Sequence, residues 1–124
     1  HSDARAVCPC ARNMTDDMIR RLGERGGCMG LNFCTDFLEL LPEGKENPGT
    51  MEAAVRHALH IVKTGGIEVL GLGSDFDGIS TNEALPGAQS MERLWDALHR
   101  EGFTEGQLEK IFWKNVLRVY RDCL

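Results

Sequence analysis

The stretch "GIEVLGLGSDFDGIS", residues 66–80, joins a short apolar run to a glycine-rich segment that carries two acids. Its first part, residues 67–73, has the length and composition of a strand that is buried on both faces, as strands of parallel sheets are. Asp75 and Asp77 follow this strand directly. In parallel α/β folds, reactive groups gather at the carboxyl ends of strands, because the loops there vary without disturbing the packed sheet. The stretch therefore predicts a parallel α/β fold with acids at the end of a strand.

The two acids admit two interpretations. Side chains at positions i and i+2 of an extended segment point the same way, so both carboxylates would face one pocket while Phe76 packs the other way. Gly78 would then allow a sharp exit from the strand. Alternatively, an aspartate near the end of a strand only caps the next turn or helix. The spacing alone leaves both interpretations open.

The rest of the chain alternates helices with strands. A helix is predicted after Thr15, with acids in its first turn and an end before Gly26. Residues 28–34, "CMGLNFC", predict a second buried strand. Thr50 begins another helix, which carries an apolar stripe and leads into the strand at 67–73. The order helix, strand, helix, strand is typical of a parallel α/β sheet.

Two more helices are predicted beyond a long loop. The first spans residues 90–102, and the second begins at Thr104, which stands at capping-box spacing from Gln107. Residues 37–49, rich in proline, glycine and charge, predict a loop. Only two strong strands are found, and an isolated pair of parallel strands leaves two unpaired edges. We therefore expect residues 1–124 to form a single partial domain that belongs to something larger.

Composition and charge narrow the classes of protein. The 124 residues suffice for one domain of ordinary size, and 42% of them are hydrophobic, which is enough for a core. A formal net charge of -5, without a basic run, argues against nucleic acid as a partner. No stretch approaches the roughly 20 apolar residues that cross a bilayer. The first residues also lack the pattern of a signal peptide, so a soluble protein is expected.

The five cysteines form an odd set, and some lie in apolar segments, where a reduced cysteine behaves as a small hydrophobe. This pattern favours a reducing, cytoplasmic location. For Cys8 and Cys10, in "CPC", the alternative is a metal or redox site. No second close pair completes four zinc ligands, so the structural interpretation is preferred.

Residues 1–27, "GLNF", "GLGSDFDGI" and "GFTEGQLEKIFWKNVLRVY" resemble the C-terminal third or so of the membrane dipeptidase (renal dipeptidase) family of zinc peptidases. The resemblance runs over nearly the whole chain, in order and with sensible spacing. It implies an α/β fold that is the C-terminal part of a TIM-type (β/α)8 barrel, with two parallel strands and flanking helices. It also implies zinc-dependent hydrolysis of dipeptides, by two zinc ions at the mouth of the complete barrel.

By the same resemblance, three residues take roles in the site. His1 matches a histidine that ends a barrel strand and ligates one zinc ion, and Arg12 matches the arginine that binds the free carboxylate of the substrate. Asp75 matches an acid that takes part in proton transfer beside the zinc pair, whereas Asp77 would support the loop. Water between two zinc ions is acidic enough to attack a peptide carbonyl near neutral pH. If the resemblance is set aside, His1 is a frayed terminus and Arg12 a solvated loop residue.

The chain also departs from the family pattern. The family's His-x-Asp pair, its bridging glutamate and a further histidine have no counterpart here, so this chain supplies one zinc ligand. Cys34 stands where the family often has an aromatic residue, and Trp113 and Lys114 stand where it has small ones. The missing strands would come from the rest of a longer chain or from another subunit, as in a homo-oligomer.

A second hypothesis comes from a different class of protein. In it, the chain is a non-catalytic barrel fragment or pseudoenzyme, whose exposed sheet edges pair with a partner. Upstream sequence with a His-x-Asp pair and a lone glutamate would favour the enzyme, and a true start at His1 would favour the interaction module.

The other histidines are also candidates for functional roles, His57 and His60 as metal ligands and His99 as a catalyst. His57 and His60 stand three residues apart on the helix after Thr50. They fall opposite the apolar stripe that includes Ala54 and Ala58, so we expect them to face solvent. His99, at the end of a later helix, is expected to offset the helix dipole.

Overall fold

Two short parallel strands form the centre of the fold in the computed structural model, which describes all residues 1–124. They are β1 (Met29–Leu31) and β2 (Leu70–Leu72), with Gly30 opposite Gly71. The prediction of two parallel strands is confirmed. Each strand is shorter than expected, and the residues before β2 form the 3-10 turn η1 (Ile67–Val69).

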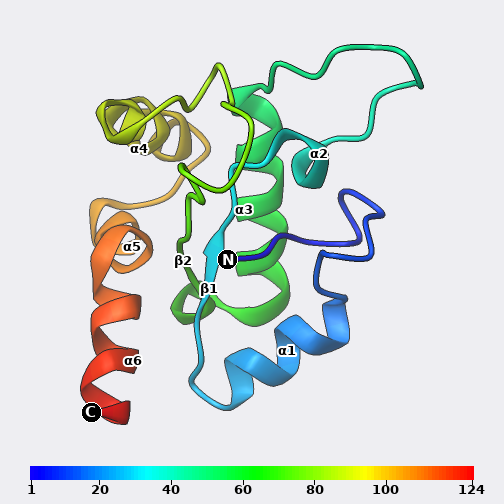
Figure 1. Cartoon of the computed structure of the whole chain (residues 1–124). Coiled ribbons are helices and arrows are strands. Elements are labelled where there is room, and N and C mark those ends of the chain that lie inside the picture. The colour runs from blue at the N-terminus through cyan, green and yellow to red at the C-terminus, as the bar shows by residue number, and fades with distance from the viewer.

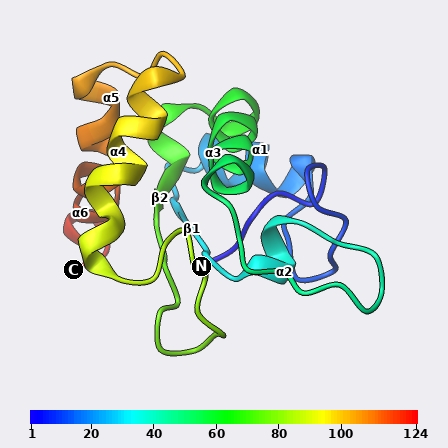
Figure 2. The same ribbon diagram turned by 90° about the horizontal axis from the view of Figure 1, so that it is seen from above.

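Helices surround this pair of strands. They are α1 (Asp16–Glu24), α2 (Thr35–Leu38), α3 (Met51–Gly65), α4 (Met91–Arg100), α5 (Glu105–Glu109) and α6 (Asn115–Cys123), with a 3-10 turn η2 (Ala88–Ser90) and a π-helical turn η3 (Lys110–Lys114). In Figures 1 and 2, α3 lies behind the strands, and α4, α5 and α6 form a column on the other side of β2. The one-turn helix α2 begins at Thr35, between the predicted strand (28–34) and the predicted loop (37–49), and ends within that loop.

The predicted helix starts are confirmed by their side-chain caps. The hydroxyl of Thr15 accepts from Met18 N at 3.3 Å, which begins α1. Thr50 caps α3 in the same way. At α5, the Thr104 hydroxyl accepts from Gln107 N at 3.2 Å, and the Gln107 side chain accepts from Thr104 N at 2.9 Å. Both bonds of this capping box satisfy amide groups that a helix start leaves without partners.

The buried face of α3 differs from the predicted stripe. It is centred on Ala54, His57, Ala58 and Ile61, all of which are 0% exposed. The prediction that His57 faces solvent is therefore wrong, because the N-terminal segment and α2 lie against this side of α3 and contact the imidazole ring. His60 is also not on a free surface, since its Nε2 lies 2.7 Å from Oδ1 of Asp16 in α1.

His57 is held at both ring nitrogens. Ala4 N donates to its Nδ1 at 3.1 Å, and its Nε2 lies 2.8 Å from the carbonyl oxygen of Leu38. Burial lowers the pKa of this imidazole. His57 thus acts as a buried polar link between α3, the N-terminal segment and α2.

A single cluster of 20 buried hydrophobic residues forms the core and draws on both strands and the helices around them. Phe33, Leu31 and Leu70 are among its largest members and are 0% exposed. Phe33 also stacks against Phe76 at 5.5 Å between ring centroids, which anchors the segment that follows β2.

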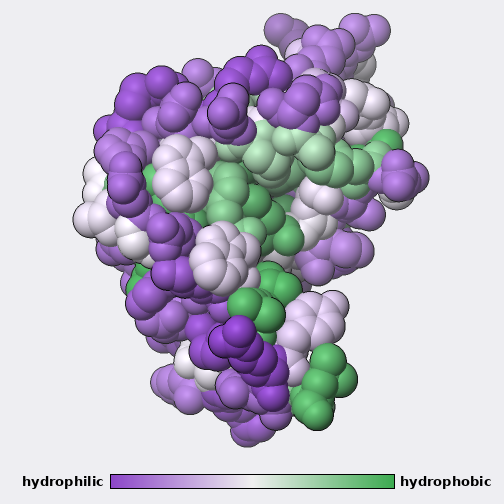
Figure 3. All heavy atoms as spheres, turned by 90° about the vertical axis from the view of Figure 1, so that its left-hand side faces the viewer, coloured by the Kyte–Doolittle hydropathy of each residue, from purple (hydrophilic) through white to green (hydrophobic).

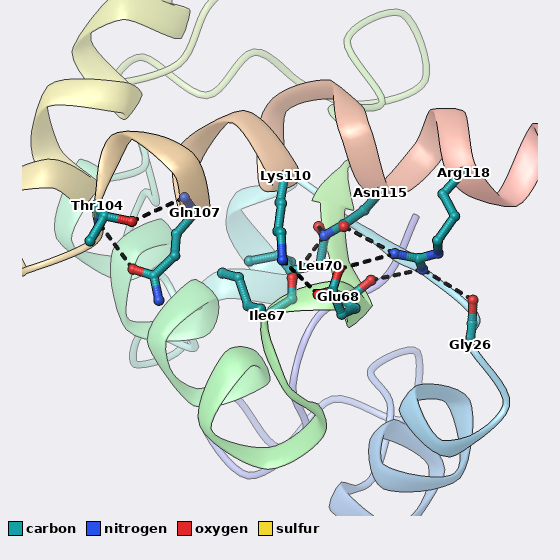
Figure 4. Close-up of polar contacts among 9 residues, drawn as sticks. All are labelled: Gly26, Ile67, Glu68, Leu70, Thr104, Gln107, Lys110, Asn115 and Arg118. Carbon is teal, nitrogen blue, oxygen red and sulfur yellow. Dashed lines mark hydrogen bonds and ion pairs between the residues drawn. The ribbon is translucent and has the colours of Figure 1, made fainter.

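Polar contacts fasten the C-terminal helices to the amino end of the sheet (Figure 4). Asn115, 1% exposed, donates from Nδ2 to the carbonyl oxygens of Ile67 and Leu70 at 2.7 and 2.8 Å. Arg118 Nη2 donates to the carbonyl oxygen of Gly26 at 3.1 Å. These bonds tie α6 to η1, to β2 and to the turn before β1.

Glu68 stands at the centre of an ion-pair network in the same place. Its carboxylate accepts from Lys110 Nζ at 2.7 Å and from Arg118 Nη1 at 3.2 Å (Figure 4). Further along the column, Lys114 Nζ lies 2.6 Å from the Glu109 carboxylate. The network is exposed, so each single pair contributes little to stability.

The outer surface of the helical column is mainly hydrophilic but carries hydrophobic patches (Figure 3). Trp113 and Tyr120 are 51% and 61% exposed. Beside β2, a hollow of about 410 Å³ is lined mostly by apolar side chains, among them Leu72, Val116 and Val119. No helix is long and apolar enough to span a membrane.

Candidate active site

The carboxyl ends of β1 and β2 receive three segments that are distant in sequence. Residues at the N-terminus run beside β1, where Ser2 N donates to the carbonyl oxygen of Gly30 at 2.9 Å. The following loop folds back on itself through a bridge between Ala4 and Met14. Asp75 follows β2. The topology therefore brings His1, Arg12 and Asp75 to one place, as the sequence predicts for a site at the ends of parallel strands.

His1 stands between the other two predicted site residues. Its Nδ1 lies 2.9 Å from Arg12 Nη2, and its Nε2 lies 4.0 Å from Asp75 Oδ1. The His1 side chain is 46% exposed and that of Asp75 23%. The Arg12 guanidinium also lies over the Phe37 ring, 5.7 Å from its centroid, which favours a fixed orientation of the cation.

Asp75 has an unusual backbone conformation. Its φ is 69°, the only positive φ outside glycine in the chain. Gly78 N donates to the Asp75 carbonyl oxygen at 3.0 Å, so the segment turns instead of continuing the strand. The interpretation in which Asp75 and Asp77 share one pocket is wrong, because it required an extended segment. Asp77 is exposed, and its side chain makes no hydrogen bond or ion pair.

Three glycines give the site its close spacing. A Cβ on Gly73 would lie 2.8 Å from the Cβ of His1, and a Cβ on Gly30 would lie 2.6 Å from the Cα of Gly73. A Cβ on Gly78 would lie less than 2.5 Å from an Asp75 carboxylate oxygen. Larger residues at these positions would displace His1 and Asp75 from the strand ends.

Asn32, directly after β1, contacts both His1 and Asp75. Its Nδ2 donates to Asp75 Oδ2 at 3.2 Å and lies 3.3 Å from His1 Nδ1. Asn32 is 0% exposed. Asn32 lies within the strand predicted at residues 28–34, and no role was predicted for it. A polar residue in an otherwise apolar run was the signal that could have identified it.

Asp3 is a second polar residue that sequence reasoning missed. It is 0% exposed, its Oδ1 accepts from Asn32 N at 3.0 Å, and its Oδ2 has no hydrogen-bond partner. Burial raises the pKa of Asp3 to about 8, against the opposing effect of the Asn32 hydrogen bond. A neutral carboxyl is therefore the favoured form near pH 7, since a buried carboxylate without compensating partners is costly.

The donor set is that of a partial metal site. His1 and Asp75 offer an imidazole and a carboxylate, which are both common zinc ligands. However, zinc takes about four ligands, and no group of three or more His, Cys, Asp or Glu side chains is placed to hold a metal ion. The five cysteines are free thiols and do not form such a group. The residues of this chain do not fit a closed metal site by themselves.

Known proteins with similar sequences cover almost all of this chain. An uncharacterized protein in the pqqA 5' region of Klebsiella pneumoniae is 36% identical over 123 residues, which are 98% of this chain and 45% of that protein. An uncharacterized dipeptidase of Schizosaccharomyces pombe is 35% identical over 125 residues, which are 98% of this chain and 29% of that protein. This chain therefore spans less than half the length of these relatives.

Solved structures with similar folds are also longer. A metallopeptidase from Rhodobacter sphaeroides, solved with a phosphinate mimic of the dipeptide L-Ala-D-Ala, matches with a TM-score of 0.83 and 33% identity. The match covers 93% of this chain and 32% of that one. The probable dipeptidase PvdM from Pseudomonas aeruginosa matches in fold, with a TM-score of 0.85 at 17% identity over 95% of this chain and 42% of its own.

These matches confirm the fold class predicted from the sequence. The structural neighbours are dipeptidases of the TIM-barrel type, and this chain corresponds to a fragment of them that contains two parallel strands and flanking helices. The sequence profile of the membrane dipeptidase family, peptidase family M19, matches residues 1–123. The chain belongs to the membrane dipeptidase family.

Proposed function

We propose that this chain is the C-terminal part of a zinc-dependent dipeptidase, and that His1, Arg12 and Asp75 contribute to its active site. The observation that carries the proposal is the convergence of these three side chains at the strand ends of a chain from a dipeptidase family. The dipeptide mimic bound by the Rhodobacter sphaeroides relative supports dipeptides as the substrate class.

The remaining metal ligands would come from outside these 124 residues. A metal pair of this kind supplies an acidified water and polarises the peptide carbonyl. Of the residues in this chain, His1 is the one that would hold a metal ion, since its imidazole is exposed at the strand ends. The other barrel strands would pack beside β2, where the apolar hollow borders the sheet.

Asp75 is the proposed proton-transfer group. Its carboxylate faces His1 and is partly exposed, so it can reach a water or a leaving amine held at the mouth of the site. It would take a proton from the attacking water and deliver it to the amine of the departing residue. Arg12 would bind the free carboxylate of the dipeptide with its planar guanidinium.

Asp75→Asn tests this proposal in the complete protein. The variant should retain its fold and lose turnover by a factor of about a hundred or more, because a proton-transfer group is lost. Asp77→Asn is the matched control, since Asp77 lies two residues away in the same loop and is exposed. The assay measures hydrolysis of a dipeptide. A greater loss in Asp77→Asn, with both variants folded, would show that the roles of the two acids were exchanged.

Arg12→Lys tests the substrate class. Lysine keeps the charge but lacks the two-pronged donor, so kcat/KM for a free dipeptide should fall by the equivalent of about 1 to 3 kcal/mol. A dipeptide amide has no terminal carboxylate, so its slower hydrolysis should change little. Equal losses on both substrates would assign Arg12 a structural role instead.

The alternative is a non-catalytic interaction module. The exposed aromatic side chains of α6 and η3 and the apolar hollow beside β2 are the observations that favour it. Metal analysis and mass measurement of the purified protein separate the two proposals. The enzyme requires a longer protein that retains metal, whereas the isolated 124-residue chain should not retain two zinc ions after dialysis, because it lacks ligands.

A further inference from the structure

Two buried asparagines of this chain have the same local geometry and different partners. Asn32 Oδ1 accepts from the backbone N of Cys34 at 2.8 Å, and Asn82 Oδ1 accepts from the backbone N of Ala84 at 3.0 Å. Both bonds span two residues and form the same kind of side-chain turn. Both asparagines are nearly inaccessible, at 0% and 1% exposure.

The asparagines differ in what their amide NH2 groups bind. Asn82 Nδ2 donates to the backbone carbonyl oxygen of Phe33 at 3.0 Å, and this hydrogen bond stabilises the fold. Asn32 Nδ2 lies between two side chains of the candidate site, 3.2 Å from Asp75 Oδ2 and 3.3 Å from His1 Nδ1. An amide NH2 has two hydrogens: the Asp75 carboxylate accepts one, and the other faces His1 Nδ1, which also lies 2.9 Å from Arg12 Nη2.

The orientation of the Asn32 amide is fixed by its other contacts. Because Oδ1 accepts from Cys34 N, the NH2 group has to face the site. The backbone of Asn32 is fixed in turn, since its N donates to the buried Asp3 at 3.0 Å. The Asn32 side chain is therefore a donor of fixed orientation. The groups that fix it are Cys34 N and the Asp3 carboxyl, and its NH2 group donates to neither of them.

We propose that Asn32 is a positioning residue that holds the Asp75 carboxylate and the His1 ring in their relative orientation. This proposal rests on the proposed function. Asp75 needs such support because it lies in a turn, with a positive φ and with a side chain that is partly exposed. Without the hydrogen bond from Asn32, the Asp75 side chain would occupy several χ1 rotamers. A proton-transfer group acts only from within hydrogen-bond reach of its substrate.

The test uses Asn32→Leu in the complete protein, with Asn82→Leu as the matched control. Leucine has the same branching and the same number of side-chain heavy atoms as asparagine but no donor. Asn32→Leu should lower kcat by about tenfold to a hundredfold, the range for residues that orient active-site groups. KM should stay nearly constant, because Arg12 is unchanged. Asn82→Leu should lower the melting temperature but leave kcat within about twofold of the wild type.

A second measurement does not depend on activity. Three-bond couplings in NMR spectra report whether the Asp75 side chain occupies one χ1 rotamer or several. We expect one rotamer in the wild type and in Asn82→Leu, and averaging in Asn32→Leu. If Asn32→Leu does not fold, Asn32→Ser replaces it, since a serine hydroxyl can accept from Cys34 N but cannot reach Asp75.

The outcomes separate this proposal from the proposed function. Equal losses of kcat in the two leucine variants, or a single Asp75 rotamer in Asn32→Leu, would overturn the positioning role. A complete wild-type protein that does not hydrolyse dipeptides would overturn the proposed function. In that case, the rotamer measurement alone still decides whether Asn32 positions Asp75.

Discussion

The two ends of the same pair of strands are built on different principles. At the amino end, Asn115 and Arg118 satisfy backbone carbonyls with short hydrogen bonds from within the chain. At the carboxyl end, Asp75 has a positive φ, Asp3 has a buried oxygen without a partner, and His1 is half exposed. At the amino end, the polar groups find their hydrogen-bond partners within the chain. At the carboxyl end, polar groups remain that lack a partner or are exposed to solvent.

This difference predicts where stability and function lie in the chain. Buried polar groups are normally paired, and exceptions in backbone geometry or hydrogen bonding concentrate at functional sites. Substitutions at the amino end should therefore reduce stability without affecting the chemistry directly. Substitutions of site residues at the carboxyl end should reduce activity with little effect on stability.

The largest change in stability is expected for Asn115→Ala. The substitution leaves the carbonyl oxygens of Ile67 and Leu70 without their side-chain donor. Each such group costs about 1 to 3 kcal/mol, so for the two carbonyl oxygens the free energy of unfolding should fall by about 2 to 6 kcal/mol. Urea unfolding measures this, with Lys110→Ala as the control, because its exposed ion pair contributes less than about 1 kcal/mol. Equal losses in the two variants would contradict the importance of the buried contacts.

A smaller, pH-dependent effect is expected at His57. Burial lowers its pKa below the ordinary value of 6.5, the bond with Leu38 opposes this shift, and the charges of Arg56 and His60 add to it. Below about pH 6.5, the unfolded chain therefore binds more protons at this position than the folded chain. The free energy of unfolding should fall as the pH is lowered from 6.5 toward the folded-state pKa.

His57→Gln isolates this contribution, because glutamine offers a donor and an acceptor but does not titrate. The variant should be less stable than the wild type at pH 7.5, and the difference should narrow at pH 5. The protection of the Ala4 amide against hydrogen exchange, corrected for the intrinsic pH dependence of the exchange rate, should fall on acidification in the wild type before that of the Leu70 amide does, since the Ala4 amide donates to His57. A constant stability difference at both pH values would contradict the role of His57 titration.

The smallest effect on stability is expected for Asp75→Gly. Glycine removes the cost of a positive φ, about 1 kcal/mol, while the bond with Asn32, worth about 1 kcal/mol, is lost. The free energy of unfolding should therefore change by less than about 1 kcal/mol. In the complete protein, dipeptide hydrolysis should be lost all the same. A large loss of stability would mean that Asp75 supports the fold, and the contrast between the strand ends would not hold.

Local signals in the sequence predicted much of the fold. Threonine caps located the starts of α1, α3 and α5, because capping depends on neighbouring residues. Short apolar runs located both strands, although the predicted strands were several residues longer than the observed ones. Helix α2 was not predicted, since its single turn has no periodic pattern to recognise.

The predictions that depended on packing between elements were less accurate. The inner face of α3 was misplaced because the segments that contact it are distant in sequence: the N-terminal segment and α2 contact His57, and α1 contacts His60. The residues His1, Arg12 and Asp75 were found through the family resemblance, and their proximity follows from parallel topology. Asn32 and Asp3 could not be given roles, because their importance arises from contacts between segments.

The π-helical turn η3 gives the junction between α5 and α6 a tolerance for a change in length. Such a turn holds one residue more than an α-helical turn, so its 5 residues turn the chain through nearly the same angle as a regular α-helical turn with one residue fewer. Deleting one residue from Lys110–Lys114 would therefore restore a regular α-helix and leave Asn115 and Arg118 facing their carbonyl partners. Relatives that keep this attachment are therefore expected to tolerate the loss of one residue within the junction.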